Sequence, residues 1–440
     1  MYGGENTLKN RSISRRTFLA GLAGGAALIA AGGWMLAGTK FGRSARHEMA
    51  QLLDGEARNL RQLMTKTPAT SRRIVWQTKS QLKAAPCVEL RDAAGKTAKV
   101  EAMEAFFADD GKDVYQYDTL LDDLQPASTY TYRIVEDGRA GDWQTLVTPA
   151  TDQGHFKAFI FPDSQSNDYT DWTHLVEGAA KREPDIDFYI NMGDLVDNGE
   201  DSTQWQAWFD AVATIAKRVP FVPVLGNHET YTLDWKVRRP EAYLHYFDMP
   251  DNGSADDKNY YYSFDYGDTH FVVLCTEWEE PAAVPEGIGD RQMAWLRRDL
   301  AANHKKWTIA LLHRDVLQYR IKKRPERKEG ISGTGEVLMP VFEEFGVDLV
   351  YTAHLHTYRD RGHLKDGKQN ENGPLYILTG VAGNVRYPGL WEDHALDKVA
   401  APQPETDNYI TLEVDGDTLT SCCFLPDGTE IDRAVIQKTR

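Results

Sequence analysis

Short apolar runs recur along the chain from residue 155 onward, and Asp, Asn, Gln or His residues follow nearly every one of them. The runs are Phe156–Phe161, Ile186–Asn191, Phe221–Val224, Thr269–Leu274, Trp307–Leu312 and Val347–Tyr351. Continuous apolar runs of this length, separated by stretches with helical spacing, are typical of buried strands in an α/β sheet. The pattern predicts an α/β domain over residues 151–440, with polar side chains gathered at its strand ends.

A different pattern fills residues 71–150, where short β-type runs alternate with turn residues. Arg73–Thr78, Val114–Tyr117 and Thr129–Val135 are examples of these runs. Such spacing predicts a small all-β sandwich. The preceding residues, 39–70, are polar with scattered Leu and Met, and we interpret them as a linker or a short amphipathic helix.

Residues 1–38 have the pattern of an export signal. Arg15 and Arg16 precede Phe18, Leu19 and a stretch rich in Ala, Gly and Leu, which resembles a twin-arginine signal. A membrane anchor is the alternative, because about 20 apolar residues suffice to cross a bilayer. We expect the twin-arginine export machinery to carry the protein to the periplasm or outside the cell. Membrane contact is expected only through this segment, if it stays uncleaved.

Composition and charge narrow the classes of function. Hydrophobic residues make up 41% of the 440 residues, and the net charge is −16. That charge repels a polyanion and argues against a nucleic-acid scaffold. A small phosphorylated substrate stays compatible, because bound metal ions outweigh a distant acidic surface. The four cysteines, Cys87, Cys275, Cys422 and Cys423, are too few for a disulfide framework, and we expect all four to be structural.

Five polar clusters carry the candidate chemistry. In chain order they are Asp163-Ser-Gln165, Gly193-Asp194-Leu-Val-Asp197, Gly226-Asn227-His228-Glu229, His313 and Ala353-His354-Leu-His356. Carboxylate, amide oxygen and imidazole are the ligands that hard or borderline divalent ions take beside phosphate. A carboxylate such as Asp194 can bridge two ions about 3.5–4 Å apart, which clamps both ends of a phosphoryl transfer. The clusters predict a site for two divalent ions, with Mn, Fe and Zn as the candidates.

The order of these clusters over residues 155–390 resembles the calcineurin-like metallophosphoesterases, whose pattern runs Asp-x-His, Gly-Asp-x-x-Asp, Gly-Asn-His-Glu, His, Gly-His-x-His. The resemblance implies a four-layer β-sandwich flanked by helices. It also implies a ligand set, with Asp163 and His356 on one metal, Asp194 bridging, and Asn227, His313 and His354 on the second. His228 would protonate the leaving oxygen, oriented by Asp197.

Other segments are similar to the purple acid phosphatase branch of that family. Leu124–Arg133 resembles a segment of the fibronectin type III-like domain that precedes the catalytic domain there, and we expect this domain to pack against the enzyme domain. Gln165 stands where the family has His, and its amide oxygen can still bind a hard ion. Asp197 replaces the iron-binding Tyr, so no purple colour is expected. Asn198 stands where protein phosphatases carry a phosphate-binding Arg, which argues against that branch.

A basic run follows His313 directly, from Arg314 to Lys328. We interpret most of it as a solvated loop, with Arg314 and Arg320 as candidates for contact with the substrate. Four aromatic residues, Trp205, Trp208, Tyr231 and Trp235, are expected to pack in the core, with a place along the cleft as the alternative.

The leading hypothesis is an exported, metal-dependent hydrolase of phosphomonoesters or phosphodiesters. Two alternatives stay open. One is a nucleotide pyrophosphohydrolase, to which Gln165 points by analogy, and the other is a catalytically weak cell-surface protein that acts by binding.

Overall fold

The structure of the protein is a computed structural model that describes residues 57–402 and 405–438. The predicted export signal, residues 1–38, lies outside the described residues. Among the helices of the described part, none combines the length and the apolar composition that a membrane crossing needs.

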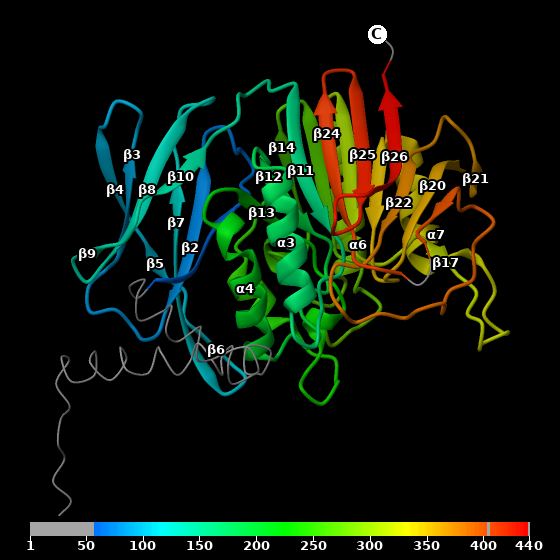
Figure 1. The fold of residues 1–440 in the computed structure, drawn as a ribbon, viewed down its shortest axis with the longest axis horizontal. Coiled ribbons are helices and arrows are strands. Elements are labelled where there is room, and N and C mark those ends of the chain that lie inside the picture. Colours follow the sequence, from blue (N-terminus) through cyan, green and yellow to red (C-terminus); the bar gives the residue numbers. More distant parts are fainter. Residues whose placement is uncertain (1–56, 403–404, 439–440) are drawn as a thin grey trace, which may run out of the picture. The chain divides into compact units, whose positions relative to one another are not determined.

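A sandwich of two antiparallel sheets forms the N-terminal part of the described chain (Figure 1). One sheet contains β1 (Arg58–Leu63), β2 (Arg72–Thr78), β7 (Lys112–Leu121), β5 (Met103–Glu104) and β6 (Phe107–Asp109). The other contains β10 (Gln144–Val147), β8 (Thr129–Glu136), β3 (Cys87–Arg91), β4 (Thr97–Glu101) and β9 (Arg139–Ala140). Alternate residues of β8, among them Tyr132 and Ile134, point inward and pack with Trp76 and Val88 in a core of their own. An all-β sandwich was predicted for this part of the chain, and the structure confirms it.

Strand β1 differs from the sequence-based expectation, which made residues 39–70 a linker or a short helix. Residues 58–63 form a strand that pairs antiparallel with β2 and parallel with β13 (Pro220–Pro223) of the following domain. The guanidinium of Arg61 is buried and donates hydrogen bonds to Gln116 Oε1 at 2.7 Å and to the carbonyl of Tyr246 at 2.6 Å. Pairing with a strand on each edge makes this segment a strand, although the local spacing of its Leu residues suggests a helix. Because β1 pairs with strands of both domains, one sheet continues through both.

Two mixed sheets form the centre of the second domain. The first continues past β13 with β12 (Phe188–Asn191), β11 (His155–Phe161), β24 (Tyr409–Asp415), β25 (Thr418–Phe424) and β26 (Glu430–Gln437). The second contains β14 (Tyr262–Tyr266), β15 (Thr269–Leu274), β16 (Trp307–Leu312), β19 (Leu349–Thr352), β22 (Leu375–Thr379), β20 (Tyr358–Lys365), β21 (Lys368–Gln369) and β23 (Val399–Ala400). The sheets share a core in which Phe188 lies 6.2 Å from Phe264 and 5.7 Å from Phe271, measured between ring centroids.

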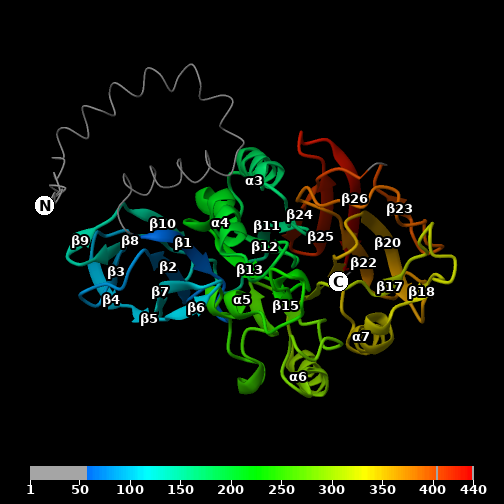
Figure 2. The same ribbon diagram turned by 90° about the horizontal axis from the view of Figure 1, so that it is seen from below.

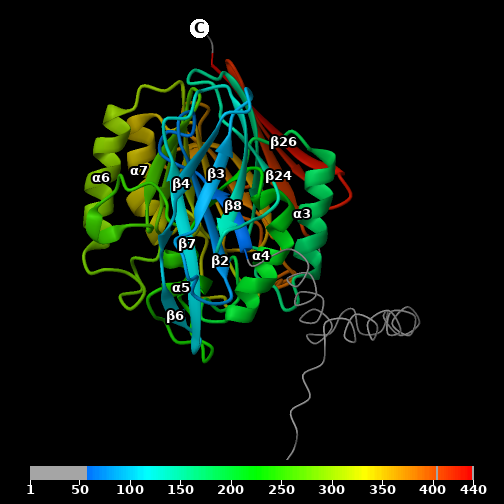
Figure 3. The same ribbon diagram turned by 90° about the vertical axis from the view of Figure 1, so that its left-hand side faces the viewer.

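Helices cover the outer faces of these sheets. Figures 2 and 3 show α3 (Thr170–Arg182) and α4 (Ser202–Ala216) on one side of the strands, and α6 (Ile288–Ala302) and α7 (Gly333–Phe345) on the other. The short elements are α5 (Glu241–Tyr246), η1 (His228–Thr230) and η2 (Ala255–Asp257). Helix α4 begins at Asp201, whose carboxylate accepts from the N–H groups of Thr203 and Gln204, and it buries Trp205 and Trp208. The predicted four-layer α/β fold is confirmed, as is the core position of these two tryptophans.

All four cysteines are free thiols. Cys422 and Cys423 follow each other on β25 and face opposite sides of that strand. No disulfide therefore links the four cysteines in this structure.

A buried histidine ties α6 to the second sheet and gives stability a pH dependence. His270 Nδ1 lies 2.7 Å from Asp265 Oδ1, and its Nε2 lies 2.8 Å from Asp299 Oδ2 on α6. Burial lowers the pKa of His270, but the two carboxylates outweigh it and raise the pKa to about 9. The unfolded value is about 6.5, so this stabilisation is complete below pH 6.5 and is lost as the pH rises through 9.

We expect His270→Gln to lower the free energy of unfolding by about 1–2 kcal/mol more at pH 6 than at pH 9.5, a range reduced for the partial exposure of Asp265. Urea denaturation of both proteins at the two pH values measures this difference. An equal loss at both values would show that the imidazole carries no extra proton in the folded protein.

Candidate metal centre

The predicted ligands come from loops that follow strands of both central sheets. Asp163 and Gln165 follow β11, Asp194 follows β12 and Asn227 follows β13. From the second sheet, His313 follows β16 directly, and His354 and His356 follow β19. Strands β11, β12 and β13 are parallel to one another, as are β16 and β19. Their carboxyl ends therefore gather the ligands at one site.

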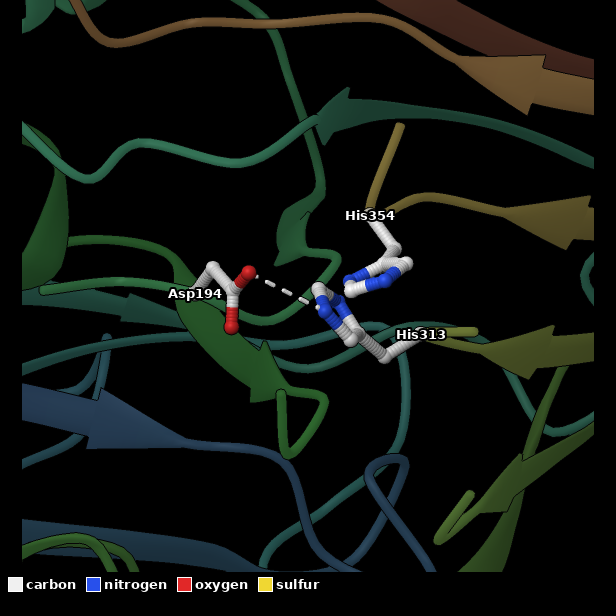
Figure 4. A group of neighbouring side chains, drawn as sticks. All are labelled: Asp194, His313 and His354. Atoms are coloured by element: carbon white, nitrogen blue, oxygen red, sulfur yellow. Dashed lines mark ion pairs between the residues drawn. The ribbon is translucent and has the colours of Figure 1, made fainter. Parts of the chain in front are cut away.

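One group of ligand atoms consists of Asp194, His313 and His354 (Figure 4). Their ligand atoms all lie within 4.8 Å of one another, and His313 Nε2 lies 3.1 Å from Asp194 Oδ2. Asn227 adds an amide oxygen 3.1 Å from the same His313 nitrogen. This is the ligand set that the family resemblance implied for the second metal.

A second group consists of Asp163, Asp194 and His356, again with all ligand atoms within 4.8 Å. His356 Nε2 lies 3.2 Å from Asp163 Oδ2. Asp194 belongs to both groups, which is the position required of a bridging carboxylate. All three side chains are almost completely buried, so a hydration shell does not compete with an ion for these atoms.

Backbone carbonyls fix the orientation of two of the imidazoles. His313 Nδ1 lies 2.9 Å from the carbonyl oxygen of Met192, and His356 Nδ1 lies 2.6 Å from that of Val385. In both rings Nδ1–H is the donor, which leaves Nε2 directed at the carboxylates. Histidines that bind metal ions are commonly oriented in this way, by a hydrogen bond from the ring nitrogen that does not bind the ion. Burial lowers the pKa of His313, but the Asp194 charge outweighs it and raises the pKa to about 10. When no metal ion is bound, protonated His313 therefore balances the negative charge of Asp194.

Three buried atoms of the site accept or donate no hydrogen bond within the described part of the chain: Gln165 Oε1, His354 Nδ1 and Asp194 Oδ2, the last of which has only the ion pair with His313. A buried polar atom without a partner costs about 1–3 kcal/mol, and the great majority of such atoms are paired. All three are groups that bind hard or borderline divalent ions. The residues therefore fit two divalent ions.

Gln165 can serve two purposes at once. Its Nε2 donates a hydrogen bond to Asp197 Oδ1 at 3.2 Å, while its Oε1 is buried and unpaired. The amide can therefore hold the Asp197 carboxylate with one end and present an oxygen ligand with the other.

His228 lies beside the ligand groups and contacts Asp197 differently from the expected carboxylate–imidazole pair. Its Nδ1 lies 2.7 Å from the backbone carbonyl oxygen of Asp197 and 3.4 Å from the carboxylate Oδ1. Burial lowers the pKa of His228, but the charges of Asp194 and Asp197 outweigh it and raise the pKa to about 9. The carbonyl fixes the ring, and the carboxylates favour its protonated form.

Left-handed backbone occurs at three ligand residues: φ is 49° at Asp194, 75° at His354 and 51° at His356. Such residues cost of order 1 kcal/mol or more each and cluster at functional sites. Ala353 stands where the family has glycine, and it is absent from the described residues with positive φ, so an alanine fits there. The glycine before the bridging carboxylate is different, because Gly193 has φ +95° and a Cβ there would lie 2.5 Å from His313 Nδ1.

The role of Glu229 was not predicted, although it closes the Gly-Asn-His-Glu cluster. Its carboxylate is buried and accepts from the backbone N–H groups of Asp194 at 3.0 Å, Leu195 at 2.7 Å and Gly226 at 2.9 Å. It therefore joins the two loops that carry Asp194 and His228. The Gly-Asn-His-Glu motif marks Glu229 in the sequence, but its hydrogen bonds to the Asp194 loop become visible only in the folded structure.

A cavity of about 260 Å³ opens over the ligands. Its lining residues are Asp194, His228, Ile321, Arg324, Arg327, His354, His356, Tyr387, Leu390 and Trp391. The predicted substrate residues Arg314 and Arg320 do not line it. Arg314 instead pairs with the buried Glu277 at 2.6 Å, and Arg320 pairs with Glu392 at 3.3 Å.

Two aromatic residues that were expected in the core lie beside His228 instead. The ring of Tyr231 is 5.1 Å and that of Trp235 is 5.9 Å from the imidazole, measured between centroids. Trp235 is 55% exposed and has φ 63°. The core expectation was wrong for Trp235, because the turn that follows Tyr231 directs its ring outward.

Comparison with known proteins agrees with this geometry. Residues 140–358 match the calcineurin-like phosphoesterase family, and residues 58–156 match the purple acid phosphatase N-terminal domain. Purple acid phosphatase 15 of Arabidopsis thaliana is 27% identical over 206 residues, which are 46% of this chain and 36% of the relative. Purple acid phosphatase 23 of the same plant is 26% identical over 300 residues, which are 60% of this chain and 62% of the relative. The chain thus matches less than two thirds of the length of either relative.

A purple acid phosphatase, PPD1 from yellow lupin (Lupinus luteus) seeds, has a similar fold. The TM-score is 0.73 at 19% identity, and the match covers 87% of this chain and 74% of that structure. The two matched domains follow each other along the chain in the order observed in the fold, and the second carries both ligand groups. The chain combines a purple acid phosphatase N-terminal domain with a calcineurin-like metallophosphoesterase domain, and its homologues are purple acid phosphatases.

Proposed function

We propose that the protein hydrolyses small phosphoesters, monoesters or diesters, at a site that holds two divalent metal ions. The observation that carries the proposal is Asp194, which belongs to both buried ligand groups and lies beside His228. Asp163 and His356 would hold one ion, with Gln165 as its neutral ligand. Asn227, His313 and His354 would hold the other. Mn, Fe and Zn all suit this donor set.

When bound, two such ions polarise phosphoryl oxygens and acidify water enough for attack on phosphorus near neutral pH. His228 supplies the proton that the leaving oxygen requires. Its Nδ1–H is directed at the carbonyl of Asp197, so Nε2, which lies 3.3 Å from Gln165 Nε2, is the nitrogen that would give a proton to the leaving group. The Asp197 carboxylate lies 3.4 Å from the same Nδ1 and accepts a hydrogen bond from Gln165, so both residues would help to position the ring.

A substrate panel with the purified, metal-analysed protein tests the proposal. We expect turnover of p-nitrophenyl phosphate or its bis ester after addition of Mn²⁺, and loss of turnover after chelation. Fe²⁺ and Zn²⁺ serve as the compared ions, and alkyl monoesters, diesters and diphosphates as the compared substrates. Binding of metal without turnover of any of these would favour the alternative of a binding protein.

We further propose that the protein is exported through the twin-arginine machinery. The support is the sequence around Arg15 and Arg16. Fractionation of cells that express the full chain is expected to find it in the periplasm or the medium. With both arginines changed to lysine, it is expected to stay in the cytoplasm; equal export of both forms would contradict the proposal.

A further inference from the structure

Two arginines that line the cavity have no carboxylate partner within the described residues. Arg324 and Arg327 line the cavity together with His228, His354 and His356. Within the described residues, neither guanidinium forms an ion pair, and the Arg327 side chain donates one hydrogen bond, from Nε to the carbonyl of Tyr319 at 3.0 Å. Other arginines near the site are paired with carboxylates, as Arg314 is with Glu277.

The chain carries a net charge of −16, with 66 Asp and Glu against 50 Lys and Arg. Burial and the charge of Arg324 both lower the pKa of Arg327, so the two like charges repel each other across the loop. Arg324 is exposed and Arg327 is half-buried, and guanidinium groups are well suited to bind carboxylate or phosphate groups. In an acidic protein with carboxylates in surplus, an arginine pair beside a phosphoester site points to an anionic ligand.

The loop holds one of these arginines in place. Arg327 has its guanidinium carbon 5.5 Å from the centre of the Trp391 ring, and its backbone N–H donates to the carbonyl of Arg324 at 3.0 Å. The loop that carries both arginines is closed by the pairing of β17 (Leu317–Gln318) with β18 (Gly330–Ile331). An arginine held this way loses less side-chain entropy on binding.

Resting on the proposed phosphoester hydrolysis, we propose that Arg324 and Arg327 form a second anion subsite, which selects substrates with another phosphate group beyond the scissile one. The ligand groups on the cavity floor would take the scissile phosphate. Ile321, Leu390 and Trp391 lie on the same wall and would contact the organic part of the substrate between the two phosphates. The cavity of about 260 Å³ lies just below the usual range of small-molecule sites, about 300–1,000 Å³, so the candidates are small molecules such as a nucleoside diphosphate or a sugar bisphosphate.

The test compares Arg324→Ala/Arg327→Ala with Lys322→Ala/Lys328→Ala. The control pair removes the same charge from the same loop, at exposed residues that do not line the cavity. We expect the arginine variant to lose roughly tenfold in kcat/KM per arginine for adenosine 5′-diphosphate, through KM, since each charge-assisted hydrogen bond contributes that much. For p-nitrophenyl phosphate and adenosine 5′-monophosphate, we expect changes of less than about threefold.

A binding measurement separates this inference from the proposed function. Calorimetry of inorganic pyrophosphate and of orthophosphate with each metal-loaded variant requires no turnover. The wild type is expected to bind pyrophosphate more tightly, and the arginine variant is expected to lose that preference while it keeps the wild-type melting temperature. Equal losses in both double variants, or a preference that survives in the arginine variant, would overturn the subsite. Absence of turnover in the wild type would overturn only the proposed function.

Discussion

Asp194→Asn is expected to lower kcat for every phosphoester by roughly three orders of magnitude or more, because ion-based stabilisation of the transition state is worth several kcal/mol. Asp194 is the one carboxylate that belongs to both ligand groups, so its loss weakens both ion positions together. Elemental analysis after dialysis is expected to find less than the wild-type content of metal. Kinetics with p-nitrophenyl phosphate at saturating Mn²⁺ measures the remaining kcat.

The choice of asparagine limits the effect to charge and coordination. The side chain keeps its size, and the backbone keeps the left-handed conformation that Asp194 has, φ 49°, which Asn tolerates well. Asp185→Asn, at an exposed carboxylate before β12, is the matched control and is expected to be indistinguishable from wild type. Wild-type kcat with a full complement of metal in the Asp194 variant would contradict the bridging role.

The ligand clusters could be predicted from the sequence because local rules place them. Each apolar run is a buried strand, and a polar residue directly after such a strand lies at the carboxyl edge of a sheet. His313 follows β16 at once, and Asp194 follows β12 after two residues. The structure brings all the predicted ligand residues to one site. They meet there because the strands that precede them are parallel within each sheet and because the two sheets share a core.

Contacts made at a distance along the chain could not be predicted. Arg314 is the first residue of the basic run, yet Glu277 is completely buried beside it and takes its charge. Nothing in the local sequence distinguishes it from Arg324, which has no such neighbour in the described part of the chain. Strand β1 shows the same limit, since its partner β13 lies more than 150 residues away.

His228→Asn is expected to lower kcat about 10²- to 10⁴-fold for alkyl phosphates, the usual contribution of a general acid, while the metal content stays at the wild-type level. The imidazole is absent from both ligand groups, and its Nδ1 contacts a backbone carbonyl rather than a site for an ion. A residue that acts on the leaving oxygen affects the reaction and leaves the ions in place. Kinetics and elemental analysis on the same sample separate these two effects.

The leaving group makes the test specific to proton donation. p-Nitrophenolate departs as a stable anion and needs little help from an acid, so its loss of kcat in the variant is expected to be much smaller than that of a simple alkyl phosphate. Tyr231→Phe, beside the same imidazole, is the control and is expected to affect both substrates alike. Equal losses for aryl and alkyl substrates in the His228 variant would exclude it as the acid.

The pH profile gives the second specific outcome. His228 acts in its protonated form, so activity on alkyl phosphates is expected to be retained below its pKa and lost as the pH rises through it. Burial opposes the protonated form, but Asp194 and Asp197 raise the pKa to about 9, and cations near Asp194 would neutralise part of that charge and lower it. The alkaline fall is therefore expected at or below pH 9 in the wild type and is expected to disappear in His228→Asn, because the variant lacks the titrating imidazole.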